Sequence, residues 1–101
     1  MTADDCALRR ACLALWSATL ALMTAYMQQR APAHRLLLAR RIAANLRTLS
    51  QQETFSAQSR AAFARLTQRW DATAAALTRP PTSQRGSGLL QRLLPFDPRA
   101  L

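Results

Sequence analysis

A chain of 101 residues forms one domain at most and buries only a modest core, so its size alone disfavours an enzyme with an enclosed active site. Half of the residues are hydrophobic, 6% are aromatic and two are glycine, which is typical of a helical bundle rather than a β-sheet protein. The formal net charge of +9 is typical of proteins that bind nucleic acids. All fourteen basic residues are arginine, however, and alanine is abundant, which indicates GC-rich bacterial coding bias. The composition therefore predicts an all-α protein, and part of its basicity is expected to reflect codon usage rather than a partner.

The first helix is expected to begin after Thr2, which can cap it together with Asp5 in a capping box, and to run to about Gln29. Between Ala11 and Gln29 it carries no charged residue. One side of this helix holds two interlaced apolar series at helical spacing, which predict a broad buried arc. The first series is Leu8, Cys12, Leu15, Thr19, Leu22 and Tyr26, and the second is Leu13, Trp16, Leu20, Met23 and Met27.

The other side of the first helix is a row of alanines, which we call the alanine stripe. Its members are Ala7, Ala11, Ala14, Ala18, Ala21 and Ala25. Their alternating spacing of four and three keeps one seam of a helix toward a partner helix, and methyl-sized side chains let two backbones approach closely. We therefore expect the alanine stripe to be a helix-contact surface and a homodimer interface, since two-fold dimers are the commonest oligomers. The alternative is that alanine is simply a good exposed helix former.

The uncharged run is long enough to raise two alternatives, a membrane span and a signal peptide. Polar residues within the run count against a span, namely Ser17, Thr19, Thr24, Gln28 and Gln29. The segment 31–33 mimics a small-x-small cleavage site, but the acids Asp4 and Asp5 before the run and Arg30 after it argue against cleavage. The expectation is a soluble, uncleaved first helix in a cytoplasmic protein, with the span kept as an alternative.

Two further helices are expected after the turn that Pro32 marks. The second covers about residues 33–49 and the third, starting from a capping box of Ser50 and Glu53, extends to about Thr78. The predicted buried face of the second helix is Leu38, Ile42, Leu46 and Leu49, flanked by Ala39. That of the third is Phe55, Ser59, Ala62, Phe63, Leu66, Trp70, Thr73, Ala74 and Leu77.

Short connections join antiparallel neighbours, so residues 1–79 are predicted to form a small antiparallel three-helix bundle. The first helix is expected in the centre, with its Leu13 and Leu15 side packed between the other two. Residues 80–101 are expected to be a flexible C-terminal tail, because Pro80 to Gly88 has the composition of a linker. The short amphipathic segment from Leu89 to Phe96 is expected to dock on the bundle or stay disordered.

Residues that carry chemistry are sparse. The five acids do not form an evident catalytic pair, and His34 has no evident partner. Cys6 and Cys12 lie about 240° apart around one helix, so they cannot form a disulfide within it, and a zinc site would need further ligands. We therefore expect a protein without enzymatic activity, cofactor or metal, whose cysteines are reduced.

Three functions remain open. The leading hypothesis is a protein-interaction or scaffolding module that self-associates through the first helix and can have a further, unidentified protein partner. The second is nucleic-acid binding through outward arginines. These arginines are Arg40, Arg41, Arg47, Arg65 and Arg69. The third is membrane association, either through the first helix or through the Leu89 to Phe96 segment.

Overall fold

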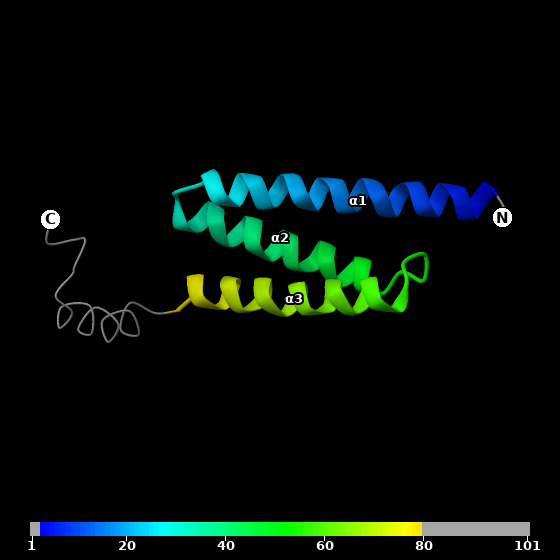
Figure 1. Ribbon diagram of the computed structural model, residues 1–101. Helices are drawn as coiled ribbons and strands as arrows, with labels where there is room; N and C mark the ends of the chain where they lie inside the picture. The colour runs from blue at the N-terminus through cyan, green and yellow to red at the C-terminus, as the bar shows by residue number, and fades with distance from the viewer. Residues whose placement is uncertain (1–2, 80–101) are drawn as a thin grey trace, which may run out of the picture.

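Three helices in antiparallel succession make up residues 3–79, the part of the chain that the computed structural model describes. Helix α1 spans Ala3–Gln28, α2 spans Pro32–Ser50 and α3 spans Ala57–Leu77 (Figure 1). The predicted all-α class and the three-helix bundle are confirmed. The Thr2 cap, the linker and the Leu89 to Phe96 segment lie outside the described residues.

The turn between α1 and α2 is short because its polar groups are satisfied locally. The backbone N–H of Ala31 donates to Oε1 of Gln29 at 3.1 Å, and the backbone N–H of Arg35 donates to the carbonyl of Ala31 at 3.0 Å. Pro32 occupies the first turn of α2, where its missing N–H has no intrahelical partner to lose. Pro32 therefore opens α2, one residue before the predicted start.

The connection between α2 and α3 differs from the prediction. The expected capping box of Ser50 and Glu53 does not start α3, because α2 continues to Ser50 and buries Leu49 completely in its last turn. Ser56 caps α3 instead, since its Oγ accepts a hydrogen bond from the backbone N–H of Ser59 at 3.1 Å. Burial of Leu49 outweighs the local capping pattern, and the third helix begins at Ala57.

The core is centred on α2, not on α1 as predicted. Ile42, Leu46 and Leu49 of α2 are fully buried and pack with Phe63 of α3. Helix α2 lies between the other two helices in Figure 1. Helix α2 can pack against both α1 and α3 because two small buried residues, Ala39 and Ala43, widen its apolar arc.

Helix α1 packs on this core through a narrower arc than its two apolar series predicted. Leu15 is half-buried against the core, but Leu13 is 51% exposed, so the predicted Leu13 side of the contact is wrong. Leu8, Leu20 and Met27 are also exposed. A helix on the outside of a bundle contacts its neighbours over only part of its circumference, and the second series lies partly beyond that contact.

Aromatic side chains join α1 to α3. The rings of Trp16 and Phe63 pack edge to face with centroids 5.1 Å apart, and those of Tyr26 and Trp70 do the same at 4.9 Å. The guanidinium of Arg35 stacks over the Tyr26 ring at 4.3 Å from its centroid. These aromatic side chains therefore connect α1 to α3 in addition to its packing against α2.

Candidate protein-interaction surface

The alanine stripe runs along α1 beside its contact with α2, on a side of the helix that is mostly exposed. Five of its members are exposed and the sixth, Ala25, is half-buried. The six residues therefore share one accessible seam, as their spacing predicted. The prediction that a second copy covers this seam is not tested by the structure of a single chain.

A second row of exposed apolar residues runs along α1, on the other edge of the same outward side. We call it the leucine row: Leu13 is 51% exposed, Leu20 46% and Met27 83%. Ser17 and Thr24 lie between the two rows, and the Thr24 hydroxyl donates to the carbonyl of Leu20 at 3.2 Å. We call the alanine stripe, the leucine row and these two hydroxyl residues together the outer face of α1.

From the sequence, the leucine row was expected to belong to the buried arc. The spacing of its members nevertheless indicated that they form a separate line along the helix. Its members are seven residues apart, so they form a line along a helix. The apolar pattern alone did not show how wide an arc the rest of the chain could cover. That width depends on α2 being the central helix.

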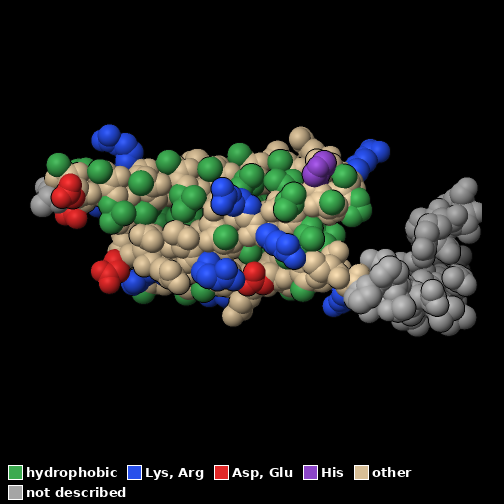
Figure 2. All heavy atoms as spheres, turned by 180° about the vertical axis from the view of Figure 1, so that it is seen from behind, with side chains coloured by type: hydrophobic (Ala, Val, Ile, Leu, Met, Phe, Trp, Pro, Cys, Tyr) green, Lys and Arg blue, Asp and Glu red, His purple; other side chains and the backbone are tan. Residues whose placement is uncertain are grey.

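Two apolar hollows lie at the ends of the seam between α1 and α2, beside the alanine stripe. One is lined by Leu8, Ala11, Cys12, Leu15, Thr48 and Gln52. The other is lined by Ala25, Gln29, His34, Leu37 and Leu38, of which Leu37 is 62% exposed. Figure 2 shows hydrophobic side chains spread along the upper helix, with charged side chains at its ends and lower on this face. The apolar surface of α1 thus continues onto an edge of α2.

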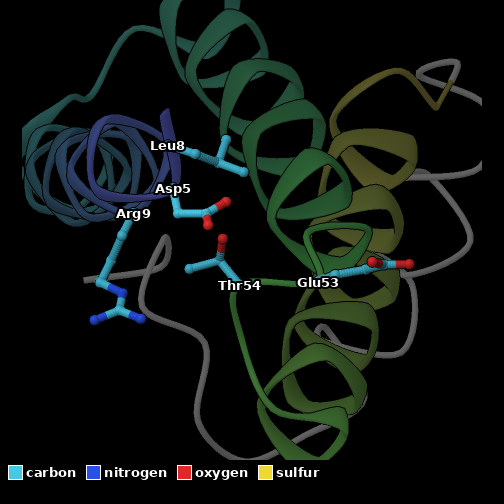
Figure 3. Close-up of a pocket in the computed structure, with 5 residues that line it drawn as sticks. All are labelled: Asp5, Leu8, Arg9, Glu53 and Thr54. Carbon is cyan, nitrogen blue, oxygen red and sulfur yellow. The ribbon is translucent and has the colours of Figure 1, made fainter. Parts of the chain in front are cut away.

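A third hollow lies where the N-terminal end of α1 meets the connection between α2 and α3. Figure 3 shows the carboxylate of Asp5 and the hydroxyl of Thr54 pointing toward one another. The side chains of Arg9 and Glu53 point away from them. With the two carboxylates turned apart, the hollow does not present the paired acids of general acid–base catalysis. The expectation of a protein without enzymatic activity nevertheless stays a prediction.

The arginines predicted to contact nucleic acid are exposed on α2 and α3. They are Arg40, Arg41, Arg47, Arg65 and Arg69. Arg47 forms an ion pair with Asp71, with Nη2 and Oδ2 2.7 Å apart, which partly neutralises its charge.

The ion pair also shows that Arg65 and Arg69 of α3 point away from Arg47 of α2. Asp71 marks the side of α3 that faces Arg47, and Arg65 and Arg69 lie about 120° and 160° from Asp71 around the helix at 100° per residue. A contiguous cationic stripe across both helices is therefore not evident. Nucleic-acid binding stays a prediction, and a gel-shift titration would test it because phosphate binding weakens steeply as salt rises.

Metal-ligating residues do not gather in residues 3–79: no group of three His, Cys, Asp or Glu side chains in this range could hold an ion. Cys6 is exposed and Cys12 is buried, consistent with their predicted separation around α1. His34 is exposed in the first turn of α2, beside the second apolar hollow. The structure therefore adds no ligands to the zinc alternative.

Comparison of the chain with protein-family models, with curated proteins and with solved structures finds no match. Within residues 3–79, α1 is long and apolar enough to cross a membrane by length and composition, a test that core helices and signal sequences also pass.

Proposed function

We propose that this protein is a non-enzymatic interaction module that self-associates through the alanine stripe on the outer face of α1. The observation that supports this proposal most directly is the exposure of an uncharged helix side in an arginine-rich protein. From Ala11 to Gln29 there is no charged residue on α1, and the alanine stripe and the leucine row are accessible along this run. An exposed contiguous apolar surface of this kind marks an interaction site in soluble proteins.

A helix is the partner that the alanine stripe fits best. The methyl side chains allow a second helix to approach closely, and the alternating spacing of four and three keeps the contact along the whole of α1. Helices α2 and α3 pack against a different side of α1, so the described residues leave most of the stripe uncovered. A second copy of the chain supplies a helix of the same length with the same small side chains.

Sedimentation of the unmodified protein and of an Ala18→Arg variant tests this proposal. Ala18 is exposed in the middle of the alanine stripe, so arginine there leaves the fold of one chain intact but blocks a close helix contact. We expect a dimer for the unmodified protein and a folded monomer for Ala18→Arg. The matched control is Ala72→Arg, at an exposed alanine of α3, which should remain a dimer. An unmodified protein that sediments as a monomer at high concentration would overturn the proposal.

Association with a membrane surface is a second candidate, supported by the length and apolar composition of α1. In this candidate the outer face of α1 lies against the lipid while α2 and α3 remain on the water side. A full span is less compatible with the packing, because α1 would have to leave Phe63 and Trp70, to which its aromatic side chains are joined. Co-flotation with lipid vesicles in the absence of detergent tests the candidate.

A further inference from the structure

We infer that two copies pair through α1 in antiparallel orientation, with the two-fold axis at the level of residue 16, between Ala14 and Ala18. The inference rests on the proposed self-association and specifies the geometry of the interface. It follows from three independent features of α1: the order of the alanines, the character of the two edges that flank them, and the distribution of charge at the helix ends.

The alanine stripe maps onto itself when the helix direction is reversed. Reversal about residue 16 exchanges Ala7 with Ala25, Ala11 with Ala21, and Ala14 with Ala18. A two-fold interface is isologous, so each residue pair must occur twice with the roles exchanged. Antiparallel pairing meets this condition along the full stripe without any gap or bulky side chain in the seam.

The edges beside the alanine stripe distinguish antiparallel from parallel pairing. The edge next to α2 carries Leu8, Leu15 and Leu22, and the opposite edge carries Arg10, Ser17 and Thr24. In an antiparallel helix pair, equivalent edges lie side by side, whereas in a parallel pair each edge faces the other kind. Antiparallel pairing thus places leucines beside leucines, and parallel pairing would place Arg10 against a leucine.

The apolar hollows lie on the same side of the alanine stripe as this leucine edge, where α1 meets α2. Leu8 and Leu15 line the first hollow, and Leu37 and Leu38 of α2 line the second. An antiparallel second copy brings its own leucine edge over both hollows, since the reversal that pairs the alanines places Leu8 of one copy near Leu22 of the other. This arrangement would bury the exposed side chain of Leu37 as well as the alanines.

Charge at the ends of α1 favours the same orientation. The first turn holds Asp4 and Asp5, and Arg30 follows the last turn. Antiparallel pairing brings Asp4 beside Gln28 of the second copy and close to its Arg30, and it also opposes the two helix macrodipoles. Parallel pairing would place Asp4 of one copy beside Asp4 of the other, and like charges so close are destabilising.

Disulfide trapping tests the orientation. In a background of Cys6→Ser and Cys12→Ala, one variant carries Ala11→Cys and another carries Ala21→Cys. In an antiparallel dimer residue 11 faces residue 21 of the second copy, and the two copies of residue 11 lie about 15 Å apart at 1.5 Å per residue. That separation exceeds the roughly 7 Å over which two Cα atoms can be bridged. The expected result is a disulfide-linked dimer only when the two variants are mixed before oxidation.

A linked dimer from each variant alone, with no preference for the mixture, would show parallel pairing and overturn the inference while leaving the proposed self-association intact. If the background variant and the unmodified protein both sediment as folded monomers, the orientation and the proposed self-association are both wrong. The background variant is checked first by circular dichroism and sedimentation. If Cys12→Ala lowers its helicity, Cys12→Val replaces it, because this position is buried among apolar side chains.

Discussion

The indole ring of Trp16 on α1 packs edge to face against the phenyl ring of Phe63 on α3, with centroids 5.1 Å apart. On another side, Phe63 meets the ring of Phe55 in the connection between α2 and α3, at 5.0 Å. One side chain of α3 thus contacts both the first helix and the loop that precedes its own helix. Phe63 is the point at which three segments of the chain come together.

Truncation of Phe63 should therefore loosen the whole bundle. We expect Phe63→Ala to lower the free energy of unfolding by about 3–5 kcal/mol, because the side chain is 7% exposed and loses two aromatic contacts. The half-buried Leu66 should give a smaller loss on truncation, of about 2 kcal/mol. Urea denaturation followed by circular dichroism measures both. Arg65→Ala, at an exposed position of the same helix, serves as the control and should change stability by less than about 0.5 kcal/mol.

The central position of α2 leads to a second prediction. Leu46 of α2 is completely buried, whereas Leu13 of α1 is 51% exposed. The same substitution, leucine to alanine, should therefore cost about 2–5 kcal/mol at Leu46 and under about 1 kcal/mol at Leu13. Thermal unfolding of the two variants compares them directly. Equal losses would mean that α1 is buried as deeply as α2, contrary to the packing described above.

The cap of α3 gives a third prediction. The Oγ of Ser56 accepts the backbone N–H of Ser59, so Ser56→Ala should cost about 0.5–2 kcal/mol. Ser50→Ala is the matched control, because the exposed hydroxyl of Ser50 donates to the carbonyl of Arg47 at the end of α2 and caps no helix start. Chemical denaturation measures the free energy of unfolding of both variants. A larger loss for Ser50→Ala than for Ser56→Ala would mean that Ser50, as predicted from the sequence, caps the third helix.

Much of the fold could be predicted from the sequence because the apolar periodicity of α2 and α3 is unambiguous. Ile42, Leu46 and Leu49 are buried as expected, and the predicted face of α3 is buried or half-buried throughout. Thr67 is a buried residue that the prediction missed. Its hydroxyl donates to the carbonyl of Phe63 at 2.9 Å, so a polar residue is accommodated in the core by its own helix.

The order of the helices in space could not be predicted in the same way. Helix α1 has the longest apolar pattern, which suggested a central position, but centrality depends on small residues that let two neighbours approach at once. Ala39 and Ala43 do this for α2, and their burial is visible only in the packed structure. The leucine row was expected to be buried but is exposed, whereas the expected role of the alanine stripe as a homodimer interface stays a prediction.

The last prediction separates the two candidate roles of the outer face. Ala18 and Leu20 are two residues apart, so their side chains lie about 160° from each other around α1 at 100° per residue. Ala18 belongs to the seam of the proposed dimer, and Leu20 belongs to the leucine row, which would enter the lipid in the membrane candidate. We expect Leu20→Arg to leave the dimer intact in sedimentation, whereas Ala18→Arg produces a folded monomer. We also expect the unmodified protein not to float with vesicles of neutral or anionic lipid. If it does float, and Leu20→Arg abolishes flotation while sedimentation shows a monomer throughout, the outer face of α1 is a lipid-binding surface and the dimer proposal is wrong.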